Sequence, residues 1–206
     1  MKKSERTRHQ LLDAALRIIS RKGYSAATVD EIVAEAGVSK GVAYYHFKSK
    51  ADMAMSILNQ EMEALTASMQ ARATEAPSAP EALLAMLDEF ASLLFGKREF
   101  ARFFMSELWR DGRIWSDDLR KRSEALAGLV AGQLARGQAD GTIRPELDPA
   151  FTAVGIIGFV LTNTLYVIDP ESASAISPER FKEQISDFVR HACAHEALRT
   201  GVVSAS

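Results

Sequence analysis

Apolar side chains recur along most of this chain at intervals of three and four residues, which is the spacing of one helix face. Near the N-terminus the pattern runs through Leu12, Ala15, Leu16 and Ile19. Similar stretches follow, separated by short breaks rich in glycine, proline or polar residues. No stretch sustains the alternation typical of strands, so the pattern predicts an all-α protein of about nine helices.

The segment from Thr28 to Lys50 predicts two short helices joined by a tight turn. Thr28 and Glu31 form a T-x-x-E capping box at the start of the first helix. Gly37 supplies the left-handed residue that ends it, and Ser39 can cap a second helix over residues 40–47. Two helices joined by a three- or four-residue turn with a glycine are typical of the helix-turn-helix, whose second helix enters the DNA major groove.

This stretch resembles the DNA-binding domain of the TetR-type transcriptional regulators. Ala43 departs from the pattern, because the family usually has a larger apolar residue there. The resemblance implies a helix-turn-helix domain over residues 1–50 and a larger helical domain over residues 51–206 that binds a ligand and dimerises. The match runs from Thr7 to about Leu58 and includes Leu11, Leu12, Asp13, Ala14, Ala15, Gly23, Tyr24, Thr28, Val29, Ile32, Ala36, Gly37, Val38, Ser39, Gly41, Tyr44, His46, Phe47, Lys48, Lys50 and Met53.

Charge is distributed unevenly along the chain. Residues 1–50 contain ten Lys or Arg and five Asp or Glu, a net charge of +5. The other residues contain 15 basic and 22 acidic side chains, a net charge of −7. The asymmetry points to an N-terminal part that faces nucleic acid and an acidic remainder that the phosphates repel.

The exposed surface of the second short helix is expected to contact DNA. We expect Lys40 and Tyr44 to reach the groove, and Gly41 to allow close approach. Cations, hydroxyls and helix N-termini hold phosphates, a role that the resemblance also implies for residues 45, 46, 48 and 50. The predicted DNA-binding residues are Thr28, Ser39, Lys40, Gly41, Tyr44, Tyr45, His46, Lys48 and Lys50.

Residues beyond the helix-turn-helix domain are rich in Met and aromatic side chains at helical spacing. This pattern by itself is typical of an ordinary core. The resemblance implies an apolar cavity among these helices. Asn163 lies in an uncharged stretch, where a buried amide needs partners, and could orient a ligand there. Asn163 is equally suited to pairing across a dimer contact. The predicted ligand-binding residues are Met62, Phe90, Phe103, Glu107, Trp109, Asn163 and Tyr166.

Two apolar helices near the end of the chain predict a four-helix contact between two copies. Residues 149–168 carry no charge, but they include Thr, Asn, Gly and Pro, so we expect a subunit contact and no membrane span. A purely internal core is the alternative. The predicted dimer residues are Gly155, Gly158, Phe159, Phe181, Ile185 and Phe188.

No catalytic sequence motif is present, and Cys193 is the only cysteine. His191 and His195 have a spacing that suits a metal, but two ligands are too few and Cys193 points to another face. We expect no enzyme activity, cofactor or metal.

The sequence predicts a cytoplasmic homodimeric repressor, released from palindromic double-stranded operator DNA by a small, mostly apolar or aromatic inducer. The alternative is a helical small-molecule-binding or enzymatic protein with a vestigial DNA-binding head.

Overall fold

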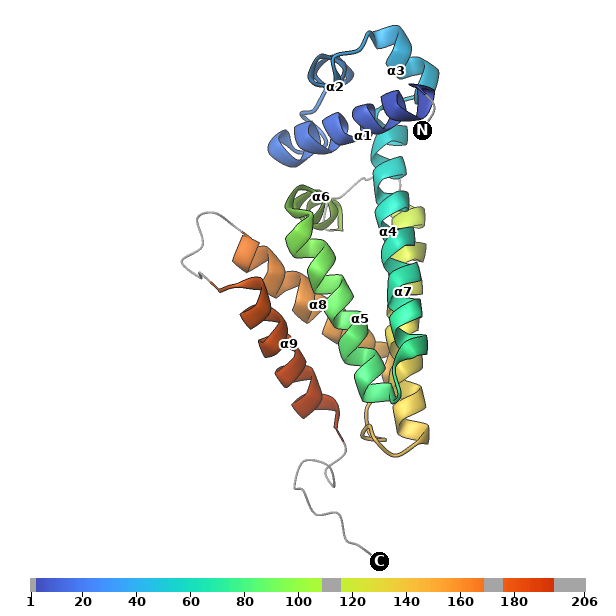
Figure 1. Cartoon of the computed structure of the whole chain (residues 1–206), viewed down its shortest axis with the longest axis vertical. Helices are drawn as coiled ribbons and strands as arrows, with labels where there is room; N and C mark the ends of the chain where they lie inside the picture. Colours follow the sequence, from blue (N-terminus) through green and yellow to red (C-terminus); the bar gives the residue numbers. More distant parts are fainter. Residues whose placement is uncertain (1–2, 109–115, 169–175, 195–206) are drawn as a thin grey trace, which may run out of the picture. The chain divides into compact units, whose positions relative to one another are not determined.

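The computed structural model of the protein describes residues 3–108, 116–168 and 176–194. In these ranges every regular element is an α-helix, apart from a single antiparallel bridge between Ile143 and Ala194. The all-α prediction is therefore confirmed for the described part of the chain. Its helices are α1 (Lys3–Lys22), α2 (Val29–Ala36), α3 (Lys40–His46), α4 (Lys50–Glu75), α5 (Ala79–Gly96), α6 (Arg98–Leu108), α7 (Ser116–Ala139), α8 (Pro149–Ile168) and α9 (Pro178–Cys193) (Figure 1).

Helix starts follow local signals in the sequence. α8 begins at Pro149. Backbone N–H groups in the first turn of a helix have no acceptor within the helix, so the N–H that proline lacks is not needed there. The Asp148 carboxylate accepts a hydrogen bond from the N–H of Phe151 at 2.7 Å. α9 begins at Pro178 in the same way, with the Ser177 hydroxyl as its cap. These side chains satisfy backbone donors that have no partner inside the helix.

The end of α9 corrects the expectation from the sequence. The pattern predicts a last helix that runs to about Leu198, but α9 ends at Cys193. Ala194 adopts an extended conformation and pairs with Ile143 in the loop between α7 and α8. The N–H of Arg144 donates to the carbonyl of Cys193 at 3.1 Å. A hydrogen bond to a distant loop thus takes the place of a further helical turn.

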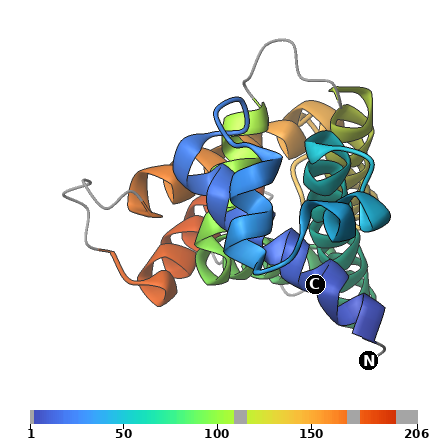
Figure 2. The same ribbon diagram turned by 90° about the horizontal axis from the view of Figure 1, so that it is seen from above.

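Residues 1–63 and 97–120 form one compact unit. Within it α1 contacts α2, α3 and α6, and the three N-terminal helices run in different directions (Figures 1 and 2). Helices as short as α2 and α3 are unstable alone, so their packing against α1 is what holds them. The buried face of α1 consists of Leu11, Leu12, Ala14, Ala15, Ile18 and Ile19.

Residues 64–96 and 121–206 form the second compact unit. Its centre is α5, which lies against both α8 and α9 (Figure 1). Lys182 on α9 and Asp88 on α5 form an ion pair at 2.9 Å beside this contact. The buried residues of α5 are Ala79, Ala82, Leu83, Met86, Leu87, Phe90, Ala91 and Leu94. No helix in the described ranges, α8 included, combines the length and the apolar character that a membrane span needs.

The two compact units are divided differently from the predicted domains. Residues 51–63 and 97–120 pack with the N-terminal helices, so the division between the units falls within α4 and α7. The predicted boundary at residue 50 coincides with the first residue of α4. This boundary was drawn between the part expected to bind DNA and the part expected to bind a ligand and dimerise, not between packing units. It stays a prediction.

Candidate nucleic-acid interface

The α2–α3 pair has the local structure that its capping signals predict. The N–H of Glu31 donates to the Thr28 hydroxyl at 3.2 Å, and the N–H of Thr28 donates to the Glu31 carboxylate at 3.0 Å. Gly37 ends α2 with φ 66°, a left-handed conformation that would strain a residue with a Cβ. The Ser39 hydroxyl caps α3 by accepting from the N–H of Val42 at 3.4 Å. The capping box, the glycine turn and the serine cap are confirmed.

Glu31 also links α2 to α1. The Lys22 ammonium donates to its carboxylate, and this hydrogen bond, followed by those from Thr28, lowers the pKa of Glu31 to about 2. Arg17 and Glu35 form a second α1–α2 ion pair at 2.8 Å. Solvent screens such exposed pairs, so each of them adds little to the stability of the fold.

α3 has one buried face and one exposed face. Ala43 and Phe47 are buried in the core of the unit, whereas the side chains of Tyr44 and Tyr45 are 51% and 81% exposed. The Tyr45 ring meets the His46 ring edge to face, with centroids 5.1 Å apart. An outer face with phenol hydroxyls and an imidazole has the hydrogen-bonding groups that contact DNA bases and phosphates. The other predicted contacts on this surface, Thr28, Ser39, Lys40, Gly41 and Lys48, are exposed too.

Lys40 is held at the start of α3 by an ion pair. Its ammonium lies 2.7 Å from the carboxylate of Asp30 on α2. This hydrogen bond raises the pKa of Lys40, with a further contribution from the charge of Asp30. Both side chains are exposed, so solvent screens the pair and keeps it weak. Lys40 can therefore exchange Asp30 for a DNA acceptor at small cost.

Lys50 occupies a different environment from the other predicted DNA contacts. Its ammonium donates to the carbonyls of Tyr24 and Ala27 at 2.5 Å each, and it lies 4.4 Å from the centroid of the Tyr24 ring. The side chain thereby closes the loop between α1 and α2. Lys48, in contrast, projects an exposed side chain. The phosphate contact expected for Lys50 would require its ammonium to leave these carbonyls.

The predicted ligand-binding residues are distributed over both compact units. Trp109 lies outside the described residues. The first unit contains Met62, Phe103 and Glu107, and the second contains Phe90, Asn163 and Tyr166.

Burial distinguishes these residues further. Met62, Phe90 and Phe103 are almost wholly buried, and so is the carboxyl group of Glu107, which has partners within the chain. The Asn163 amide donates to the carbonyl of Phe159 one turn earlier in α8, at 2.7 Å. One N–H of this amide thus has a partner within its own helix.

Two of the predicted dimer residues face inward. Phe181 and Ile185 are each 3% exposed, and the Phe181 ring lies edge to face with Phe95 of α5, with centroids 4.8 Å apart. Side chains that their own chain already covers have no surface left for a second copy. We therefore remove these two from the predicted contact.

The other predicted dimer residues lie on an outer face. Phe188 is half exposed and stacks on Phe159, with centroids 4.2 Å apart. No neighbouring atom lies within 4 Å of the position that a Cβ would take at Gly155 or Gly158. Packing within the chain does not require these glycines, and they leave the backbone of α8 open to close approach by another helix.

Sequence reasoning missed two residues of this outer face. Phe151, Val154 and Tyr166 of α8 are 81%, 62% and 62% exposed, and neither Val154 nor Tyr166 was assigned to a dimer contact. The absence of charge in α8 is the signal that could have identified them. A helix that is apolar on every side is typically buried on every side, so its outer face calls for a partner.

The histidine pair on α9 does not form a metal site in the described residues. His191 Nδ1 lies 2.8 Å from the carbonyl oxygen of Asp187 on the same helix, and His195 lies outside the described ranges. No group of three or more His, Cys, Asp or Glu side chains is arranged there to hold a metal.

Residues 11–57 match the family described as bacterial regulatory proteins, tetR family. The chain is 26% identical to the fatty acid metabolism regulator protein of Bacillus subtilis (strain 168) over 169 residues, covering 82% of this chain and 87% of that protein. It is 24% identical to the HTH-type transcriptional regulator SrpR of Pseudomonas putida, covering 79% of this chain and 75% of the relative. These relatives are transcriptional regulators.

The fold is similar to that of FadR from Bacillus subtilis, a transcriptional regulator solved in complex with stearoyl-CoA. The TM-score is 0.78 at 24% identity, over 88% of this chain and 96% of that one. The family match covers α2, the glycine turn and α3, whose caps and exposed face are described above. The chain belongs to the TetR family of DNA-binding transcriptional regulators.

Proposed function

We propose that this regulator is a cytoplasmic repressor that binds a palindromic operator as a homodimer and releases it when a small, mostly apolar molecule binds. Residues 1–50 bind the DNA, and residues 51–206 bind the inducer and dimerise. The protein has no enzymatic activity and uses no cofactor. The observation that carries the proposal is the exposed outer face of α3, with its two tyrosines, on a helix whose opposite face is anchored in the core.

The DNA contacts divide into two kinds. Lys40 and Tyr44, near the start and middle of α3, read base edges in the major groove. Tyr45, His46 and Lys48 contact the phosphate backbone, as do the caps of the two helices, Thr28 and Ser39. Gly41 has no side chain and allows α3 to come close to the bases.

The outer face of α8 and α9 is the dimer contact. It exposes Phe151, Val154, Tyr166 and Phe188, all large apolar or aromatic side chains. An α8–α9 pair from each copy would cover these residues in a four-helix contact. The shared symmetry of the dimer and a palindromic operator then places one α3 in each half-site.

Acyl-coenzyme A thioesters are the first inducer class to test. The Bacillus subtilis FadR structure contains stearoyl-CoA, and AibR, whose fold this chain shares with a TM-score of 0.75 at 20% identity, was solved with isovaleryl coenzyme A and operator DNA. The buried Met and Phe residues predicted to bind the ligand suit an acyl chain. Glu107 and Asn163 are the polar residues of the same prediction.

Release follows from the geometry of the dimer. Recognition helices must lie about 34–36 Å apart to enter successive major grooves. A ligand that binds better to a dimer with another spacing shifts the population away from DNA, and DNA weakens the ligand by the same factor.

The test is a fluorescence-anisotropy titration of labelled DNA from the region upstream of the protein's own gene. We expect salt-dependent binding that a random duplex of equal length shows only weakly. Acyl-CoA thioesters of increasing chain length are then added, with free coenzyme A as the control. Failure to bind any upstream DNA in preference to random DNA would favour the helical ligand-binding or enzymatic alternative. Binding without release by any thioester would reject this inducer class only.

A further inference from the structure

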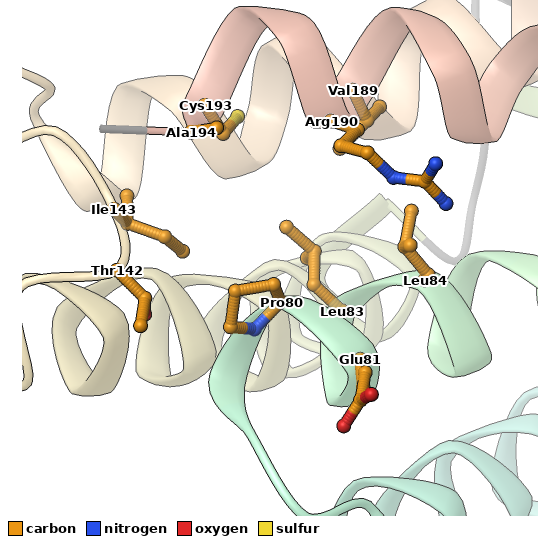
Figure 3. A pocket seen from close by; sticks show the side chains of 10 residues that line it. All are labelled: Pro80, Glu81, Leu83, Leu84, Thr142, Ile143, Val189, Arg190, Cys193 and Ala194. Carbon is orange, nitrogen blue, oxygen red and sulfur yellow. The ribbon is translucent and has the colours of Figure 1, made fainter. Parts of the chain in front are cut away.

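The second compact unit contains a cavity that takes in none of the residues assigned above to DNA, inducer or dimer. It measures about 360 Å³ and lies between the start of α5, the loop after α7 and the end of α9 (Figure 3). This volume falls in the range typical of small-molecule sites, about 300–1,000 Å³. The lining residues are Pro80, Glu81, Leu83, Leu84, Thr142, Ile143, Val189, Arg190, Cys193 and Ala194.

Most of the cavity wall is hydrocarbon. Pro80 and Leu83 come from α5, Ile143 from the loop after α7, and Val189 from α9, and Figure 3 shows them around one space. Apolar walls of this kind favour an apolar chain over water. The inner part of the site therefore selects a hydrocarbon group.

The charged groups at the cavity are not balanced. Glu81 points away from the space (Figure 3), and its carboxylate accepts a hydrogen bond from the hydroxyl of Ser78 at 3.0 Å. The guanidinium of Arg190 makes no ion pair or hydrogen bond with any described residue and lies at the cavity margin. The nearby Asp187 carboxylate is 3.2 Å from the His191 ring. Among the described residues, the site thus offers a cation without a charge partner beside apolar walls.

We propose that this cavity binds a small amphiphilic carboxylate, with its hydrocarbon chain against Leu83, Ile143 and Val189 and its carboxylate on Arg190. Guanidinium groups match carboxylates in charge and geometry and bind them through two parallel hydrogen bonds. Arg190 is solvent-exposed, so the carboxylate keeps part of its hydration while the chain leaves water. The site is separate from the residues predicted for the inducer, and the inference goes beyond the proposed function.

Cys193 provides a built-in reporter of occupancy. It is the only cysteine of the chain, and its side chain lines the cavity (Figure 3). Burial raises the pKa of its thiol, so alkylation is slow and easily followed at a fixed alkaline pH. A ligand that covers the thiol slows alkylation by the factor 1 + [L]/Kd, about tenfold at nine times Kd.

The experiment follows iodoacetamide labelling of the full chain by mass spectrometry during a titration with octanoate. We expect octanoate to protect Cys193, and Arg190→Gln to raise the octanoate Kd about five- to tenfold. Octanol lacks the charge, so we expect it to bind more weakly than octanoate. We expect Arg190→Gln to leave the octanol Kd unchanged. No DNA is needed, so failure of this inference and failure of the repressor proposal are distinguishable.

Two tryptophan variants show whether protection arises at this cavity or from general stabilisation. Leu84 and Leu93 are both half-buried leucines of α5, but only Leu84 lines the cavity. Leu84→Trp fills the space and should abolish protection by octanoate, whereas Leu93→Trp should retain it. Melting temperatures confirm that both variants fold, and calorimetric titration gives a second measure of Kd.

Three results would overturn the proposal. One is the absence of protection at every octanoate concentration below that at which octanoate forms micelles. Another is protection that survives Leu84→Trp, which would place the ligand elsewhere. The third is an Arg190→Gln variant that binds octanoate as tightly as the unmodified protein does, because the cation would then have no part in binding.

Discussion

Replacing Lys50 with methionine tests whether its ammonium holds the loop between α1 and α2 or is available to DNA. Methionine keeps an unbranched apolar stem and a high helix propensity at the first residue of α4, so the change mainly deletes the charge. The deleted contacts include the hydrogen bonds to the carbonyls of Tyr24, Ser25 and Ala27 and the contact with the Tyr24 ring.

The magnitude follows from these contacts. A hydrogen bond to a charged group contributes about 1.5–3 kcal/mol, and a cation over an aromatic ring about 0.5–1 kcal/mol at an exposed site. The freed carbonyls belong to a partly exposed loop and regain water, which reduces the simple sum. We expect Lys50→Met to lower the free energy of unfolding by about 2–3 kcal/mol, or the melting temperature by about 4–12 °C.

Lys48→Ala is the matched control, because the Lys48 side chain is exposed and only two residues away. It should leave the melting temperature within about 2 °C of the original, as surface substitutions usually do. It should also reduce the salt slope of operator binding by about 0.9 for each protomer bound, through loss of one phosphate contact. Thermal unfolding and anisotropy titrations at several salt concentrations measure both quantities. An unchanged melting temperature for Lys50→Met, with a salt slope reduced as in Lys48→Ala, would refute the loop-closing role and restore the phosphate contact.

Three further predictions concern recognition, assembly and pH. Tyr44→Ala should weaken operator binding by about 1–3 kcal/mol with less effect on random DNA, and equal losses on both duplexes would contradict base readout. Gly158→Leu should break the close helix contact and yield monomers in light scattering, whereas a monomeric unmodified protein at micromolar concentration would disprove the dimer. The pKa of Glu31 is lowered from 4.5 to about 2 on folding, so its stabilising contribution is present above pH 4.5 and is lost as the pH falls towards 2. Urea unfolding from pH 6 to pH 2 should therefore show a smaller loss of stability for Glu31→Gln than for the unmodified protein, and identical profiles would count against this linkage.

The sequence by itself determined the helices and the turn between α2 and α3. Capping residues, the left-handed Gly37 and the prolines at Pro149 and Pro178 act on backbone groups within a few positions, so their effects can be read locally. The exposed face of α3 was also predictable, because the helical period alone separates Tyr44 and Tyr45 from the buried Ala43 and Phe47.

Only the tertiary structure decided which partners distant side chains find. The carbonyls that hold Lys50 lie 26 and 23 residues before it in the sequence, and α9 ends where Ala194 meets Ile143. Helical spacing places Phe181 and Phe188 on the same apolar face of α9, but α5 covers only Phe181. Burial depends on which helix lies against which face, and local sequence does not encode that choice.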